Sequence, residues 1–175
     1  SDSYNPDPYN MGSYSGSFAQ RSYLPKTQLE ITPAGAGGGE ITVHDGSTTN
    51  AYVPVYGFYA DAYLKSESVY PASELSAMNG ANITSMKFYA NESSVNWGAA
   101  NFQVFLAEVA NTTLSAFNGP GTVVYEVALS IDANGEMMVN FTTPYQYNGG
   151  NLLVGVYNTV EGSYVSCSWY GESVD

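Results

Sequence analysis

The amino-acid sequence predicts an all-β protein, an antiparallel β-sandwich of jelly-roll type with an N-terminal arm that carries a strand. Three observations lead to this fold class. Short segments rich in Val, Ile, Tyr and Phe recur between turn residues, apolar and polar side chains alternate within them, and one short segment alone has helical character. About eight or nine strands at this spacing are typical of an antiparallel sandwich. With 44% hydrophobic residues in 175, the chain can bury a sizeable core.

The N-terminal arm, residues 1–39, precedes a sandwich predicted to occupy residues 40–175. Its first part is rich in Ser, Tyr, Asn, Pro and Gly without periodicity, as in a flexible leader. Residues 20–32 then have the alternation of a strand, which Pro25 interrupts, so an edge strand or a bulge is expected. The linker AGAGGG at 34–39 follows, and six such residues span at most ~20 Å.

The predicted strands of the body show a period of two in several places. Every odd position from Val123 to Ile131 is apolar, and the pattern returns at Met137, Val139 and Phe141. The same reasoning predicts strands at 40–44, 51–59, 61–65, 83–90, 101–109, 122–131, 136–143, 151–158 and 163–170.

Two connections have recognisable turn or helix chemistry. DANG at 132–135 contains Asn134-Gly135, which is strong hairpin chemistry. Residues 71–80 are predicted to form one or two helical turns that Ser73 caps and Gly80 ends.

Composition limits the classes of partner. The chain has four basic and 16 acidic residues, for a net charge of −12, which disfavours nucleic acid and anionic membranes because both bind through cationic side chains. No apolar run approaches the roughly 18 residues needed to cross a bilayer, so no membrane insertion is expected. The first residue is not Met, and we expect a processed chain with an extracellular or cell-surface location.

The sequence contains no catalytic constellation, and no enzymatic activity is predicted. His44, the one histidine, has no evident nucleophile or orienting partner. Cys167 alternates with Val165 and Trp169, as a small buried hydrophobe would. Trp97 lies in a predicted loop and is the candidate for stacking on a sugar, although a ring folded onto the core is favoured.

No cofactor or metal is predicted, with calcium kept as a minor alternative. Asp132, Asn134 and Glu136 alternate as some calcium ligands do, but the hairpin accounts for them. Four Asn-X-Ser/Thr sequons are also present, and chance explains them because Asn and Thr are abundant.

From about residue 46, the chain resembles a jelly-roll module of adhesin-like surface proteins of Gram-negative bacteria, related to the cleaved-adhesin group. The resemblance implies an extracellular adhesive or structural module without catalytic residues. It lies in the core pattern and turns of TNAYVPVYGFY (49–59), VYPASEL (69–75), ITSMKFYA (83–90), FQVFLAEV (102–109) and TPYQYNGGNLLVGVYN (143–158).

One element departs from this resemblance. QRSYLPKT, at 20–27, is similar to the element that closes such modules, yet here it precedes the body. Three explanations stay open: the tail of a preceding tandem copy, a strand that folds back onto its own sandwich, or a strand inserted into a neighbouring subunit.

Insertion into a neighbour leads to the predicted function. A strand donated to an incomplete sandwich restores its hydrogen-bond ladder, as in donor-strand complementation. The anchors would be Tyr23, Leu24, Leu29 and Ile31, and the acceptor groove would include Val165, Cys167 and Trp169.

We therefore expect a structural protein, the subunit of an extracellular filament or pilus-like appendage that is a homopolymer of identical subunits. The alternative is a carbohydrate- or surface-binding adhesin module of a larger secreted protein, whose partners would be glycans or cell surfaces.

Overall fold

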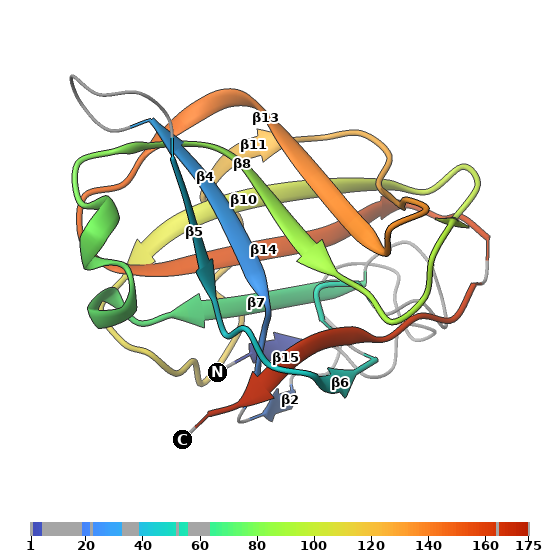
Figure 1. Ribbon diagram of the computed structural model, residues 1–175, viewed down its shortest axis with the longest axis horizontal. Helices are drawn as coiled ribbons and strands as arrows, with labels where there is room; N and C mark the ends of the chain where they lie inside the picture. The colour runs from blue at the N-terminus through green and yellow to red at the C-terminus, as the bar shows by residue number, and fades with distance from the viewer. Residues whose placement is uncertain are drawn as a thin grey trace.

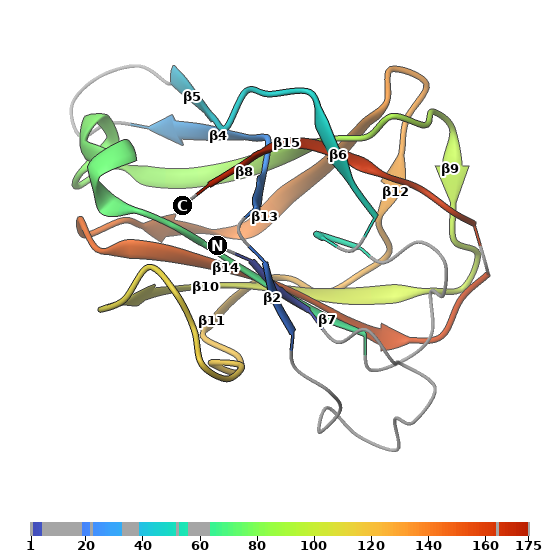
Figure 2. The ribbon, with the colours of Figure 1, turned by 90° about the horizontal axis from the view of Figure 1, so that it is seen from below.

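A computed structural model gives the fold of residues 2–4, 19–21, 23–32, 39–51, 53–55, 64–163 and 165–174. Nearly all of the secondary structure in these ranges is antiparallel β, which confirms the predicted all-β class. Two layers of strands lie face to face with the core between them (Figure 2). The jelly-roll type is a finer assignment and stays a prediction.

The first layer is a six-stranded sheet with β14 and β7 at its centre. In spatial order it contains β11 (Thr122–Tyr125), β10 (Asn101–Val109), β14 (Asn151–Val160), β7 (Lys65–Tyr70), β1 (Asp2–Tyr4) and β2 (Ala19–Arg21).

The second layer is a four-stranded sheet, visible in the upper part of Figure 1. Its order is β13 (Glu136–Gln146), β8 (Asn82–Tyr89), β4 (Thr27–Thr32) and β5 (Gly39–Val43). A three-stranded sheet contains β3 (Tyr23–Pro25), β15 (Trp169–Ser173) and β6 (Thr48–Asn50), and a pair contains β12 (Ser130–Ile131) and β9 (Val95–Asn96).

Strands between residues 65 and 160 pair in a nested order. β7 pairs with β14, β8 with β13, β9 with β12 and β10 with β11, all antiparallel. The strands β7 to β10 thus form one side of a long antiparallel ribbon, and β11 to β14 form the other side in reverse order. We call residues 65–160 the nested ribbon.

The core lies between the two layers and is rich in large rings. Trp97 and Trp169 have ring centroids 6.5 Å apart, Phe102 lies 5.8 Å from Trp97, and Phe88 lies 6.4 Å from Trp169. All four side chains are almost fully buried. Edge-on and tilted contacts of this kind suit the charge distribution of aromatic rings.

A second apolar cluster lies on the outer face of the six-stranded sheet. It contains Val69, Phe105, Leu153 and Tyr157, which alternate with core residues along their strands. Phe105 lies across Gly155, where a β-carbon would come within 2.0 Å of the ring. The six-stranded sheet is therefore apolar on both faces.

Most predicted strands of the nested ribbon are confirmed. The segment 101–109 is β10 to the residue, and 83–90, 136–143 and 151–158 correspond to β8, β13 and β14. The predicted strand at 40–44 is β5. The linker at 34–38 and most of the predicted strands at 51–59 and 61–65 lie outside the described residues.

Two strand predictions were wrong. The run 122–131 divides into β11 and β12, which belong to different sheets, so Val124 becomes buried while Val127 is 56% exposed. In the run 163–170, the described residues 163 and 165–168 are irregular, and β15 begins at Trp169.

The turn at 132–135 is confirmed. Asp132 accepts hydrogen bonds from the backbone N–H groups of Asn134 and Glu136, and Gly135 has a φ of +78°, a conformation that glycine adopts without strain. The helical segment at 71–80 is two 3-10 turns, η2 (Ala72–Glu74) and η3 (Ser76–Met78). Ser73 lies inside η2 and caps nothing, which corrects the prediction.

Candidate functional site: the N-terminal strands and the edges they cover

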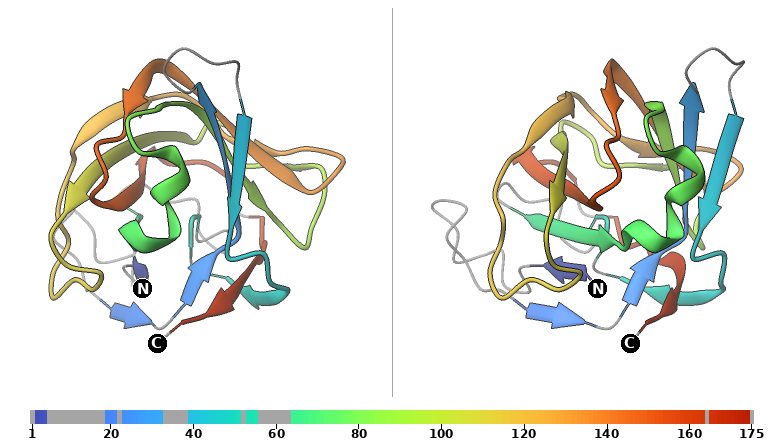
Figure 3. Two further views of the ribbon diagram at one scale, coloured as in Figure 1. Left: turned by 60° about the vertical axis from the view of Figure 1, so that its left-hand side comes forward. Right: turned by 90° about the vertical axis from the view of Figure 1, so that its left-hand side faces the viewer.

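The predicted strand at 20–32 is divided among three sheets: residues 20–21 belong to β2, residues 23–25 to β3 and residues 27–32 to β4. β3 lies at the edge of its sheet, so Pro25 has the edge position expected of it. β4, in contrast, lies between β8 and β5, and the expectation of an edge strand is wrong for it. Figure 3 shows this blue segment turning from beside β15 into the four-stranded sheet.

β4 fills a slot in the four-stranded sheet. Leu29 lies opposite Met86 of β8 and Ile31 opposite Ile83, and the exposed fractions of Leu29 and Ile31 are 1% and 5%. On the other face, Ser85 donates a hydrogen bond from Oγ to Oε2 of Glu30 at 2.7 Å. Both faces of β4 are therefore matched to β8.

β3 covers the C-terminal strand. Leu24 lies opposite Glu172 of β15 and is 1% exposed. Tyr23 reaches across β15, and its hydroxyl group donates to the carbonyl oxygen of Trp169 at 2.8 Å. The contact requires Gly171, because a β-carbon there would lie 2.3 Å from the carbonyl oxygen of Leu24.

The arm also supplies β1, which pairs with β7 of the six-stranded sheet, Ser3 opposite Glu67. Besides its hairpin partner β5, the arm thus covers one edge of each of three body strands, β7, β8 and β15, which belong to three different sheets. An uncovered strand edge exposes unpaired N–H and C=O groups that invite pairing with another chain. The arm and these three edges form the candidate functional site.

The four predicted anchors, Tyr23, Leu24, Leu29 and Ile31, are all buried. The predicted groove residues are only partly brought together with them. Trp169 lies on β15, next to β3.

Val165 and Cys167 instead lie before β15 and pack near Trp97 and Val55. The sequence prediction missed β8 and β7 because it sought the groove at the C-terminal end alone. The polar stretch at 65–68 gives no strand pattern that could have indicated β7.

The burial of β7 depends on polar partners. Glu67 is 0% exposed, and its carboxylate accepts hydrogen bonds from the Tyr157 hydroxyl at 2.6 Å and from the backbone N–H groups of Asn118 and Gly119. Burial raises the pKa of Glu67 and lowers the pKa of Lys65, whose charge partly opposes the effect on Glu67. Glu67 therefore holds the β10–β11 loop against the outer face.

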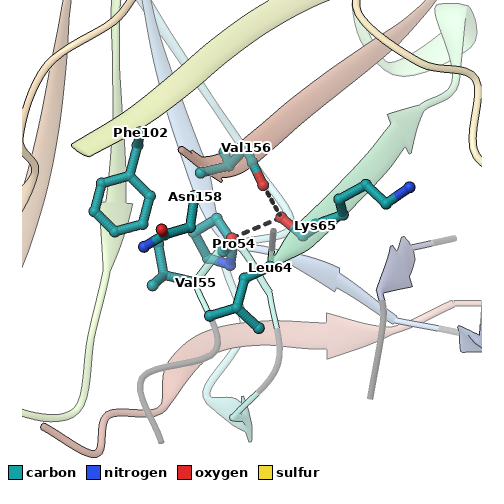
Figure 4. Close-up of a pocket in the computed structure, with 8 residues that line it drawn as sticks. Pro54, Val55, Leu64, Lys65, Phe102, Val156 and Asn158 are labelled. Atoms are coloured by element: carbon teal, nitrogen blue, oxygen red, sulfur yellow. Dashed lines mark hydrogen bonds between the residues drawn. The ribbon is translucent and has the colours of Figure 1, made fainter. Parts of the chain in front are cut away.

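A small cavity lies beside β7 and is too small for a substrate. Its volume is about 10 Å³, room for at most one water molecule. Ser66 donates to the carbonyl oxygen of Pro54 there at 2.6 Å, while the Lys65 side chain extends away from the cavity (Figure 4).

His44 joins three segments of the body. Its Nδ1 lies 2.7 Å from Oε1 of Glu172 on β15, and its Nε2 lies 2.6 Å from Oε2 of Glu74 on η2. The side chain is 5% exposed, and the backbone has a φ of +52°, a left-handed conformation that is costly for a residue other than glycine. Sequence reasoning could not pair His44 with carboxylates so distant along the chain.

The interpretation of Trp97 as a sugar platform is corrected. Its side chain is 1% exposed, its Nε1 donates to the carbonyl oxygen of Val165, and its ring packs between Phe102 and Trp169. A ring with both faces in the core has no surface for a ligand. Cys167 is buried as predicted, with an exposed fraction of 3%.

In the described ranges, no three or more His, Cys, Asp and Glu side chains converge as metal ligands would. Asp132 of the DANG turn uses one carboxylate oxygen for two backbone N–H groups. The same ranges contain no helix of the length and hydropathy that a membrane span needs.

These features define a class of architecture: an antiparallel all-β protein whose N-terminal strands complete three sheets of the body. Comparison of the chain with protein-family models, with curated proteins and with solved structures found no match.

Proposed function

We propose that this protein is the subunit of an extracellular homopolymeric filament, assembled when the N-terminal strands of one subunit occupy the edges of β8 and β15 in the next. The observation that carries the proposal is the dependence of β7, β8 and β15 on one terminal arm for their second edges. Because the arm covers several strand edges at once, one subunit could donate the whole arm to the strand edges of another.

The same contacts form whether the arm is the chain's own or a neighbour's. Leu29 and Ile31 meet Met86 and Ile83 in either case, so exchange changes the connectivity without changing the packing. The free-energy difference between the two arrangements then lies in the hinge and in new contacts between bodies, as in domain swapping.

The hinge is the connection between β4 and β5. Its sequence from Pro33 to Gly38 contains three glycines, which have little backbone preference, so opening the hinge requires little conformational energy. Six residues span at most ~20 Å, so exchanging subunits would lie in direct contact. Donor and acceptor are different surfaces, and such a head-to-tail contact propagates into a filament unless it closes into a ring.

A disulfide ladder tests the proposal in the full chain. Glu30 and Ser85 are register partners with a side-chain hydrogen bond of 2.7 Å, so Glu30→Cys with Ser85→Cys, in a Cys167→Ala background, places two thiols across the β4–β8 boundary. We expect oxidation to give a ladder of covalent multimers on a denaturing gel, and filaments by negative-stain electron microscopy.

The matched control is Glu30→Cys with Lys87→Cys, which lies out of register because Lys87 is opposite Gln28. We expect few multimers from it. Complete disulfide formation within monomers of the first variant would overturn the proposal and would mean that β4 closes its own sandwich.

A further inference from the structure

A surface cleft lies where the arm, β15 and the loop after β5 meet. The hollow is shallow and widely open to solvent, with a volume of about 440 Å³, and it is lined by Lys26, Asp45, Gly46, Ser47 and Tyr170. Lys26 comes from the junction of β3 and β4, and Tyr170 from β15. Side chains distant in sequence therefore converge on one hollow.

The loop at 44–47 is held in a fixed conformation. His44 keeps its left-handed backbone while both ring nitrogens are bonded to the carboxylates of Glu74 and Glu172. Gly46 lies so close to β15 that a β-carbon would be 2.5 Å from the carbonyl oxygen of Gly171. Strained backbone that the surroundings hold in place is a feature of ligand-binding sites, and here it presents Asp45 and Ser47 to the cleft.

The polar groups of the cleft are balanced in charge. Lys26 Nζ lies 2.8 Å from Asp45 Oδ1 and also 4.2 Å from the centre of the Tyr89 ring. The Asp45 side chain is nevertheless 70% exposed and retains acceptor capacity. The Tyr170 hydroxyl group is hydrogen-bonded to Asn91 Oδ1 at 2.5 Å, which fixes the half-buried ring at the edge of the cleft.

This chemistry selects against three kinds of ligand. An anion would meet a lysine already paired with Asp45, on a protein of net charge −12. Calcium requires about six to eight oxygen ligands, and the lining contains one carboxylate. An apolar ligand would bury the ion pair without compensating hydrogen bonds.

We propose that this cleft binds a neutral saccharide. The C–H groups of a sugar ring carry partial positive charge and suit the negative face of an aromatic ring, and Tyr170 supplies such a ring in the lining of the cleft. Sugar hydroxyl groups both donate and accept, so they match Asp45, Ser47 and Lys26 together. The cleft has the same lining whether Lys26 comes from the same chain or from a neighbour's arm, so the inference is independent of filament assembly.

The test uses the intact protein and five insoluble neutral polysaccharides: cellulose, chitin, xylan, mannan and curdlan. After a low-speed spin, the protein left in solution is measured, with cross-linked alginate as an anionic comparison. We expect depletion by at least one neutral polysaccharide and none by alginate. Tyr170→Ala should weaken this binding about ten-fold.

Asp45→Ala is the second variant, because its exposed side chain makes unfolding an unconvincing explanation for lost binding. It should weaken binding as well, whereas Glu126→Ala, which removes the same charge from an exposed position on another part of the surface, should not. Binding to none of the five polysaccharides, or binding that both cleft variants retain, would overturn the proposal.

Discussion

The nested ribbon and the terminal strands are built on different principles. In the ribbon, each strand pairs with one at the matching position on the way back, from β10 with β11 out to β7 with β14. β3 pairs across almost the whole chain, with Leu24 opposite Glu172, and β4 pairs outside the nested order, with Leu29 opposite Met86. Residues 65–160 can therefore form their strand pairs one after another, starting from β10 and β11. β3 and β15 can pair only after the two ends of the chain have come together.

This difference has a consequence for motion. The arm can leave β8 and β15 without breaking any strand pair inside the ribbon, because β8 keeps β13 and β7 keeps β14. Partial openings of this kind are the low-energy fluctuations of folded proteins. A protein whose arm opens before its body unfolds is suited to exchange the arm with a neighbour.

Of the changes that test the difference between ribbon and arm, removal of residues 1–32 should have the largest effect on the stability and solubility of the protein. The truncated chain keeps the ribbon but exposes the edges of β8 and β15, and we expect loss of the monomer to aggregates in size-exclusion chromatography. A synthetic peptide of residues 19–32, added in excess, should restore a soluble species and raise the thermal midpoint measured by circular dichroism.

The control peptide carries Leu29→Lys and Ile31→Lys, which place charges in the two buried pockets of β4. It should restore nothing. A truncated chain that stays monomeric and melts at the same temperature as the full chain would show that the arm contributes little, and the comparison would fail.

A pair of core truncations gives a smaller and more informative effect. Leu29 on β4 and Leu106 on β10 are both at most 1% exposed and belong to the same core cluster. Each change to alanine should lower the free energy of unfolding by about 2–5 kcal/mol. Amide hydrogen exchange should separate them, because Leu106→Ala should accelerate exchange in β10 and β14 but leave that of β4 unchanged.

The reason is that the arm-open state keeps the contacts of Leu106 but loses those of Leu29. Leu29→Ala should therefore accelerate exchange in β4 directly. If Leu106→Ala accelerates β4 as much as β10, the arm and the ribbon open as one cooperative unit.

Alternation of apolar residues predicted the strands that bury one face. β10 and β13 could be located because Val104 and Val139 recur at a period of two with their neighbours. The same signal failed at Val127, where the chain leaves one sheet for another and the buried face changes. A change of sheet depends on the partner strand, which local sequence does not specify.

Partners distant in sequence also decided what could be predicted of the candidate site. β7 is buried despite Lys65 and Glu67, because Tyr157 and the loop near Asn118 satisfy Glu67 from 51 or more positions away. Trp97 resembles an exposed loop residue until the fold brings Trp169 beside it. The strand character of residues 27–32 was recognisable from their alternation, but the edges that the N-terminal strands cover were not.

The smallest expected effect concerns Glu67, the buried acid of the ribbon. Burial raises its pKa above the ordinary value of 4.5, so the folded state retains a proton at pH values where the unfolded state has released it. The stabilisation that this proton uptake gives the folded state is therefore complete below about pH 4.5 and is lost as the pH rises through the folded-state pKa.

Glutamine cannot titrate, so Glu67→Gln removes this pH dependence. The free energy of unfolding of the wild type minus that of Glu67→Gln should therefore be smaller at about pH 8 than at about pH 5. Urea unfolding at both pH values measures the difference, and Glu126→Gln, at an exposed position, should show none. A difference that grows with pH would mean that Tyr157, two backbone N–H groups and Lys65 stabilise the Glu67 anion more than burial destabilises it.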